Sequence, residues 1–395
     1  MTVLPALVHP VSPQEFQQEY WERQPLVVHR DDPDHYADLL TLDGIDRMIS
    51  MAGQKLDNVR VVLDGKGTSI EDLVAKRPGR NAPTHALEAL YERYRTGSTV
   101  VLNGAHERWE PLRRLAHALG GELGALVRMN VYLTPAGARG FTPHYDKHDV
   151  FVAQIHGTKR WRLARARHEL PLPEQRYDKS KAAAEPDQEF DLRAGDLLYL
   201  PRGTIHSASS NDTASAHITI GIRPVIWAQV IGDAVEEVFA EDVRFRRSLP
   251  IGFADDPALR DQVAHTAADL LDALRARLSP QALAARSAER VVSISAPVLR
   301  HHLTDLEDLA RLDTGTRVRR RPELCWRLTT DGGAVVLRFH DKSVELPADT
   351  AEEVRYLTGK DGSWFTAADL PGGPDEAGRL ALVRTLVREG FLTLR

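Results

Sequence analysis

The stretch FTPHYDKHDVFVAQIHGTKRW, residues 141–161, decides which kind of fold this chain adopts. His144 and Asp146 stand two residues apart in a segment that continues into the apolar run Val150–Ile155, a pattern that predicts a β-strand. Residues i and i+2 of a strand point to the same face. The spacing therefore lets an imidazole and a carboxylate converge on one ion.

A second stretch, AGDLLYLPRGTIHSA at residues 194–208, supplies a third candidate ligand. Gly195-Asp196 predicts a turn, Leu197–Leu200 predicts a buried strand, and His206 follows a proline and a glycine that bring the chain inward from a neighbouring strand. Two histidines and one carboxylate form a facial set that leaves the other positions of an octahedral ion open, which suits non-haem Fe(II). We therefore expect a metal centre formed by His144, Asp146 and His206.

Together these stretches resemble the paired motifs of a cupin barrel, and more specifically those of the JmjC-type 2-oxoglutarate oxygenases. The general cupin pattern has a glutamate as a fourth ligand where this chain has Val150 and Phe151, and its loss leaves room for a 2-oxoacid and dioxygen. Lys159 stands where this family carries the basic residue that pairs with the distal carboxylate of 2-oxoglutarate. A carboxylate taken into a barrel needs such a compensating charge.

The resemblance implies an α+β fold built on a double-stranded β-helix, the cupin/JmjC barrel. It implies Fe(II) as cofactor, 2-oxoglutarate as co-substrate, and succinate and CO2 as products beside a hydroxylated protein side chain. The opening segment EFQQEYWERQPLVV, residues 15–28, resembles the ribosomal-oxygenase branch. The expected substrate is therefore a ribosomal protein, oxidised at an arginine or a histidine.

The alternating strand predicted at residues 124–135 places Asn130 and Tyr132 on one face. In the family this strand faces the cofactor, which makes both residues candidates for hydrogen bonds to 2-oxoglutarate; alternatively, a buried strand merely tolerates them. His148 lies two residues, about 7 Å, beyond Asp146 along a strand and receives no ligand role. His217 is expected to be a core residue. The polar segment 165–191 is predicted to be a long loop bordering the substrate entrance.

Length and composition describe an ordinary globular protein of several domains. The chain has 395 residues, 42% of them hydrophobic and 27% charged, and its net charge of −5 carries no nucleic-acid signature. Cys325 is its one cysteine, which excludes an intramolecular disulfide and fits a reducing compartment. No signal peptide and no run of eighteen apolar residues occurs. We expect a cytoplasmic protein with no membrane contact.

The sequence predicts three domains. The barrel with its flanking elements occupies residues 1–225, a helical module residues 226–310, and a mixed tail residues 311–395. Apolar residues at helical spacing predict helices at 227–245, at 256–278 and from Ser279-Pro280 onward. The resemblance implies that this module forms a homodimer, and the alternative is an intramolecular bundle.

The tail resembles the winged-helix module that closes the ribosomal oxygenases. Residues 325–330 and 334–340 predict a hairpin, and helices are expected at 350–358, 366–370 and 375–389. The helices carry Glu352, Glu353, Asp375 and Glu376, and only residues 317–321 form a basic cluster. Direct DNA binding is therefore not expected, and protein contact or dimer support is favoured. The basic run fits a solvated linker equally well.

Three other functions compete with hydroxylation of a ribosomal protein. In the first of these functions, the same chemistry acts on a small molecule or a peptide natural product. The second is demethylation of methyl-lysine, which JmjC resemblance alone allows. The third is a metal-binding cupin without enzymatic activity that serves as a regulator.

Overall fold

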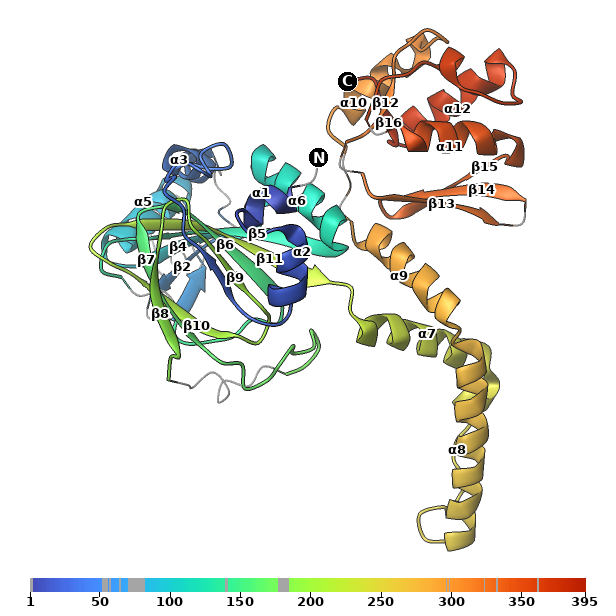
Figure 1. Cartoon of the computed structure of the whole chain (residues 1–395), viewed down its shortest axis with the longest axis horizontal. Helices are drawn as coiled ribbons and strands as arrows, with labels where there is room; N and C mark the ends of the chain where they lie inside the picture. Colours follow the sequence, from blue (N-terminus) through green and yellow to red (C-terminus); the bar gives the residue numbers. More distant parts are fainter. Residues whose placement is uncertain are drawn as a thin grey trace. The chain divides into compact units, whose positions relative to one another are not determined.

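The computed structural model describes residues 3–51, 56, 58–63, 65–69, 82–138, 141–176, 185–295, 297, 299–322, 324–331, 333–360 and 362–395. The chain divides into two compact units, Met1–Pro224 and Val225–Arg395, each with a hydrophobic core of its own. Figure 1 draws the first in blue to green and the second in yellow to red. The predicted division into three domains stays a prediction.

The first unit is built on two antiparallel sheets that form the walls of a barrel (Figure 1). This confirms the predicted α+β double-stranded β-helix. The smaller sheet has the order β10 (Ile205–Ser210), β7 (Thr158–Ala164) and β8 (Gln188–Arg193). The larger sheet has the order β1 (Leu26–Val28), β9 (Leu197–Leu200), β6 (Asp149–His156), β11 (Ser215–Pro224), β5 (Ala125–Thr134), β4 (Thr99–Leu102), β2 (Val59–Leu63) and β3 (Lys66–Ser69).

Helices cover the outer face of the larger sheet. Helix α6 (Glu110–Leu123) buries one apolar stripe against β5 and ends at Gly124, whose left-handed φ of 58° suits a residue without a Cβ. β5 alternates between buried and less buried positions, so its odd-numbered residues join this core and its even-numbered residues face the barrel interior. The other helical segments of this unit are α1 (Leu4–Val8), α2 (Pro13–Glu15), η1 (Phe16–Tyr20), α3 (Leu42–Met51), α5 (Ala82–Arg95) and η2 (Ala105–Glu107).

The opening segment packs on the same core through aromatic rings. Phe16 and Trp21 lie against Tyr199 of β9, with ring centroids 4.9 and 5.9 Å away. The Tyr199 hydroxyl accepts a hydrogen bond of 3.0 Å from the backbone N–H of Glu22. Trp21 is thus part of the packing between the first helices and the sheet.

The segment that carries His144 and Asp146 is not the continuous strand that the alternation predicted. β6 begins only at Asp149, and His144 forms an isolated bridge with His206, with backbone N–H to carbonyl distances of 3.1 and 2.8 Å. The carbonyl of Asp146 accepts a hydrogen bond from the N–H of Gly203. The backbone of this segment is thus bonded to the chain around His206. Pro143, which precedes it, has no N–H to donate to a ladder.

The predicted loop at 165–191 is wrong at its end. Residues 188–193 form β8, an edge strand of the smaller sheet that pairs with β7. Its outward side chains are polar and form ion pairs with β7. Asp191 pairs with Arg160, and Glu189 pairs with Arg162. The polar residues of this outer face therefore gave the sequence the pattern of a loop. Residues 177–184 of the predicted loop lie outside the described residues.

The second unit contains helices followed by a mixed α/β part. The predicted starts of two helices are confirmed by their caps, since the side chains of Asp256 and Ser279 accept hydrogen bonds from Ala258 N–H and Ala282 N–H. The helical segments are α7 (Trp227–Glu241), η4 (Val243–Arg246), α8 (Pro257–Arg277), α9 (Pro280–Ile294), α10 (His302–Asp308), η5 (Leu309–Arg311), η6 (Ala348–Thr350), α11 (Ala351–Gly359), η7 (Ala367–Asp369) and α12 (Glu376–Arg388).

Two small antiparallel sheets complete this unit. One pairs β12 (Arg319–Arg320) with β16 (Leu392–Thr393), and the other has the order β13 (Trp326–Asp331), β14 (Ala334–Phe339) and β15 (Lys342–Leu346). The predicted hairpin is thus present as β13 and β14, and Gly332 of its turn lies outside the described residues. The winged-helix resemblance stays a prediction.

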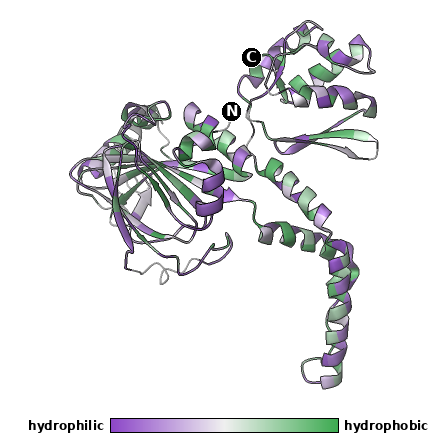
Figure 2. Ribbon diagram, in the orientation of Figure 1, coloured by the Kyte–Doolittle hydropathy of each residue, from purple (hydrophilic) through white to green (hydrophobic). Residues whose placement is uncertain are grey.

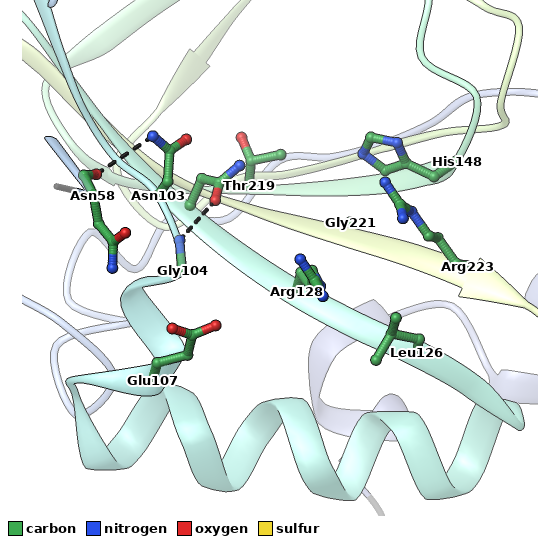
Figure 3. A pocket seen from close by; sticks show the side chains of 11 residues that line it. Asn58, Asn103, Gly104, Glu107, Leu126, Arg128, His148, Thr219, Gly221 and Arg223 are labelled. Carbon is green, nitrogen blue, oxygen red and sulfur yellow. Dashed lines mark hydrogen bonds between the residues drawn. The ribbon is translucent and has the colours of Figure 1, made fainter. Parts of the chain in front are cut away.

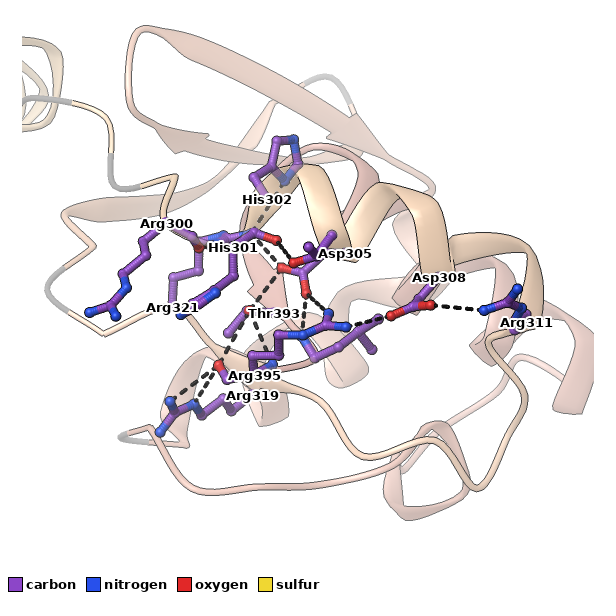
Figure 4. A network of polar contacts seen from close by, with 12 residues as sticks. Arg300, His301, His302, Asp305, Asp308, Arg311, Arg319, Arg321, Thr393 and Arg395 are labelled. Carbon is purple, nitrogen blue, oxygen red and sulfur yellow. Dashed lines mark hydrogen bonds and ion pairs between the residues drawn. The ribbon is translucent and has the colours of Figure 1, made fainter.

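A buried ionic network joins α10 to β12 and β16 (Figure 4). The carboxylate of Asp305 is fully buried and accepts hydrogen bonds from Arg321, Thr393 and Arg395 at 2.7, 2.8 and 3.2 Å. A buried carboxylate requires such partners. The backbone N–H of Leu394 adds a further bond of 3.2 Å.

The helices α7 and α8 carry exposed apolar side chains. Helix α8 has 21 residues and none of them is buried. Trp227, Leu271 and Ile251 are 72%, 65% and 100% exposed, and Figure 2 shows hydrophobic bands, drawn in green, on both helices. Within the described part of the chain, no helix combines the length and apolar character needed to cross a bilayer.

Candidate metal centre and the barrel interior

The structure brings His144, Asp146 and His206 together inside the first unit. One potential ligand atom from each lies within 4.8 Å of the others. Nε2 of His206 is 3.6 Å from Oδ2 of Asp146, and the two imidazole rings have centroids 4.3 Å apart. Two imidazoles and one carboxylate at these separations match the donor set of a divalent metal with open coordination positions.

Each histidine presents Nε2 to this cluster. Nδ1 of His144 lies 2.9 Å from the carbonyl oxygen of Thr142, and Nδ1 of His206 lies 3.0 Å from that of Thr204. A carbonyl only accepts hydrogen bonds, so Nδ1 carries the proton in both rings and Nε2 keeps its lone pair. This is how proteins usually orient histidines that bind metals.

The charge states also suit a cation. Burial lowers the pKa of His206 to about 4, which leaves this imidazole neutral at pH 7. Burial alone would raise the pKa of Asp146, but His206, His148 and His144 together hold it below its ordinary value. At neutral pH the cluster therefore offers a neutral ring and an ionised carboxylate.

An ion network ties the two ligand-bearing segments together. Asp149, three residues after Asp146, is fully buried and accepts a hydrogen bond of 2.8 Å from the guanidinium of Arg202, four residues before His206. Arg202 also pairs with Glu22, and its backbone N–H bonds Asp149 at 3.1 Å. Burial raises the pKa of Asp149 although Arg202 opposes this shift. The network holds β6 against the chain that follows β9.

Lys159 lies inside the barrel without an anionic partner among the described residues. Its side chain is 3% exposed, and Nζ donates a hydrogen bond of 3.0 Å to Oγ1 of Thr134. Burial lowers the pKa of this amine to about 7. A buried amine that bonds only to a neutral hydroxyl is costly unless an anion binds beside it.

Three further polar groups near Lys159 point to a ligand at the same place, and the sequence reasoning missed two of them. Oγ1 of Thr134 accepts from both Lys159 and Thr99, which leaves its own hydrogen to donate. Nε1 of Trp161 and Nδ1 of His217 are buried without a hydrogen-bond partner among the described residues. The interior thus contains polar groups, among them the Trp161 donor, that an added ligand would satisfy.

The same alternation that identified Asn130 and Tyr132 would have found Thr134, which shares their face of β5. Trp161 likewise shares a face of β7 with Lys159. His217 was assigned to the core, and the structure does bury it. Its unpaired ring nitrogen depends on the surroundings and leaves no signal in the sequence.

Tyr132 and Asn130 interact with each other in the barrel interior. The Tyr132 ring stacks on His217 with centroids 4.9 Å apart, and its hydroxyl interacts with the side chains of Asn130 and Arg60. Burial raises the pKa of Tyr132. The carboxamide oxygen of Asn130 accepts a hydrogen bond of 3.0 Å from Gly104 N–H, so its amide group remains as the donor.

Comparison with known proteins shows what the barrel is similar to. Residues 105–230 match the model of the JmjC domain. Ribosomal oxygenase 1 of Danio rerio is 27% identical over 98% of this chain and 78% of its own length. The chain is a homologue of the JmjC ribosomal oxygenases.

Further relatives match this chain over different shares of their own length. The bifunctional lysine-specific demethylase and histidyl-hydroxylase NO66 of Dictyostelium discoideum is 33% identical over 63% of this chain, which spans 49% of that protein. Among solved structures, the Escherichia coli ribosomal oxygenase YcfD in complex with cobalt and 2-oxoglutarate superposes with a TM-score of 0.52. That likeness covers 97% of this chain and 98% of the other at 17% identity, and it shows the fold.

Proposed function

We propose that this chain is an Fe(II)- and 2-oxoglutarate-dependent dioxygenase that hydroxylates a side chain of a ribosomal protein. The observation that carries the proposal is the His144–Asp146–His206 cluster in the same barrel as a buried Lys159 that has no anionic partner among the described residues. A metal set with open positions and a separate buried cation are what a chelating dicarboxylic acid needs at its two ends.

The ligands of the metal are His144 and His206 through Nε2 and Asp146 through its carboxylate. Bound Fe(II) supplies the redox chemistry that couples decarboxylation of 2-oxoglutarate, which yields succinate and CO2, to oxidation of a C–H bond. The carbonyls of Thr142 and Thr204 fix the orientation of the two rings. Val150 and Phe151 point into hydrophobic cores and add no fourth ligand.

The distal carboxylate of 2-oxoglutarate is bound by Lys159 and by the hydroxyl of Thr134. Both are donors directed into the barrel interior, and a carboxylate between them would return the amine to its charged form. Tyr132 and Asn130 donate further hydrogen bonds, from the hydroxyl and the amide group. These side chains bind and orient the co-substrate and exclude water from it.

The substrate is a ribosomal protein, and the oxidised residue is an arginine or a histidine. The names of the relatives support the class of substrate, and the Dictyostelium relative is named both as a histidyl-hydroxylase and as a lysine-specific demethylase. Because of the second name, demethylation of methyl-lysine is an alternative reaction. The same assay must distinguish it from hydroxylation.

The experiment supplies the purified chain with Fe(II), 2-oxoglutarate and ribosomal proteins from cells that lack its gene. We expect succinate and a ribosomal protein with one added oxygen on arginine or histidine, detected by mass spectrometry. His144→Ala should abolish both, while His265→Ala on the exposed helix α8 should leave both unchanged. Succinate without a hydroxylated protein, or release of a methyl group, would contradict the proposed reaction.

A homodimer through the helices of the second unit is part of the same proposal. The exposed apolar side chains of α7 and α8 and of the segment between them support it, because a large apolar surface gains free energy when a second copy covers it. The mixed part of this unit would then support the dimer or contact protein, without direct binding of DNA.

A further inference from the structure

A polar pocket opens into the first unit beside the candidate metal centre (Figure 3). It has a volume of about 330 Å³ and lies over the inner faces of β5 and β11. Asn130 lines it and also interacts with Tyr132, and His148 lines it two residues after Asp146. The pocket is therefore next to the place where a substrate C–H bond would have to lie.

Two arginines in this pocket have no partner among the described residues. Arg128 of β5 and Arg223 of β11 are exposed, and neither forms an ion pair or a hydrogen bond there. Arg128 pairs with Gly221 in the antiparallel register, and Arg223 is two residues further along β11. Diagonal neighbours of this kind share a face and lie within reach of each other's long side chains.

Gly221 makes room for a third basic group at the same end. A Cβ at this position would lie 2.8 Å from Cδ2 of His148, so a larger residue would displace the imidazole. Figure 3 shows Arg223 and His148 together at one end of the pocket, with Arg128 between them and Glu107. Two unpaired guanidinium groups and an imidazole thus face one small volume.

The other end of the pocket has the opposite charge. The carboxylate of Glu107 lies over Gly104, where a Cβ would come within 3.2 Å of its Cδ, and Asn58 and Asn103 stand nearby (Figure 3). A ligand with a single carboxylate near the arginines is therefore favoured. A ligand with several negative charges in a row would also come close to Glu107, which repels it.

We infer that Arg128 and Arg223 form a carboxylate-binding subsite that selects substrates with an aspartate or glutamate close to the oxidised residue. The inference rests on the proposed hydroxylase function and adds a sequence preference to it. Guanidinium groups bind carboxylates through two parallel hydrogen bonds, which gives direction as well as affinity. Arginines beside a reaction centre that no described residue neutralises are suited to such recognition.

The test measures binding separately from turnover. The probes are fluorescent nine-residue peptides with a histidine or an arginine at the centre. Each peptide of the first series has a single glutamate at one of the flanking positions, so that the series covers all of them. Each has a matched control peptide with glutamine at the same position. Their affinities for the full chain loaded with Mn(II) and 2-oxoglutarate are measured by anisotropy. For at least one position we expect the glutamate peptide to bind about tenfold more tightly, as one charge-assisted pair provides.

Variants assign this preference to the subsite. Arg128→Gln/Arg223→Gln should reduce it to less than about twofold, and Arg47→Gln/Arg93→Gln, which removes two exposed arginines elsewhere in the unit, should retain it. Glu107→Gln should retain or increase it. Equal affinities for glutamate and glutamine peptides, absence of any binding, or a preference that survives in the first double variant would overturn the inference.

The two proposals fail in different ways. An acid preference in the wild-type chain that forms no succinate supports the subsite and contradicts the proposed hydroxylase function. Hydroxylation of peptides without an acid preference supports the function and overturns the subsite. Tighter binding of a single-stranded RNA oligonucleotide than of any acidic peptide, dependent on the same two arginines, would also overturn the assignment to a protein carboxylate.

Discussion

Lys159 is a buried amine with no anionic partner among the described residues. Its amine is buried against the hydroxyl of Thr134, and burial lowers its pKa to about 7. A buried amine in this state destabilises the unliganded protein. Binding of an anion beside it removes this cost. Function and stability should therefore respond in opposite directions when this side chain is changed.

Lys159→Met should stabilise the protein without 2-oxoglutarate by about 1–3 kcal/mol, because an apolar side chain of similar length replaces a buried amine. It should also remove the rise in melting temperature that 2-oxoglutarate gives the metal-loaded wild-type protein. Thermal melts with and without 2-oxoglutarate measure both effects. A destabilised variant that still responds to 2-oxoglutarate would refute the role assigned to this lysine.

The pKa of Lys159 also predicts how stability depends on pH. The folded protein binds this proton only below about pH 7, whereas the unfolded chain keeps it to the ordinary value of 10.5. Between these values the unfolded chain binds more protons, so the stability of the unliganded protein should rise with pH across this window. The rise should be on the order of a few kcal/mol. Urea unfolding from pH 7 to 10 should show it in the wild type and not in Lys159→Met.

At the scale of elements, the candidate ligands depend on contacts between segments that are not neighbours in the sequence. Asp149 at the start of β6 and Arg202 after β9 form a buried ion pair that holds the two ligand segments together. Breaking one partner of such a pair leaves an uncompensated buried charge.

Asp149→Ala should therefore cost about 3–5 kcal/mol of unfolding free energy and weaken Mn(II) binding, since Arg202 loses its buried partner. Asp191→Ala is the matched control, because it removes the partly exposed partner of Arg160 on the outside of β7 and should cost less than about 1 kcal/mol. Urea denaturation and calorimetric titration with Mn(II) measure the two effects. Equal losses in both variants would argue against a special role of the buried pair.

At the scale of the whole molecule, the two units have separate cores. The network around Asp305 lies wholly within the second unit. Asp305→Ala should destabilise that unit by about 3–5 kcal/mol, because Arg321 would be buried without its carboxylate. Metal binding by the first unit should persist. Calorimetric unfolding together with Mn(II) titration tests this separation, and loss of Mn(II) binding would contradict it.

The exposed apolar side chains of the second unit lead to a prediction about assembly. Leu271→Glu on α8 and Trp227→Glu on α7 should convert a dimer to monomers, because a charge would have to be buried in the apolar interface. Sedimentation velocity at several concentrations measures this change. His265→Ala on the same helix is a surface control and should leave the dimer intact. A wild-type chain that sediments as a monomer would refute the predicted homodimer.

The sequence by itself determined the class of fold and the candidate metal ligands. Both depend on local patterns, the His-x-Asp pair and the apolar runs of 150–155 and 197–200, and on the resemblance of these motifs to a known family. The α+β barrel was predicted in this way. The polar edge strand β8 was missed, because its ion pairs with β7 depend on a partner that a local pattern does not reveal.

Only the tertiary structure decided which distant side chains meet. The bridge between His144 and His206, the bond from Lys159 to Thr134 and the pairing of Arg128 with Gly221 each join segments far apart in the chain. Such neighbours are set by the register between strands and by which face of each strand is turned inward. A shift of one residue would send every side chain of a strand to the opposite face, so these contacts exist only once the barrel has closed.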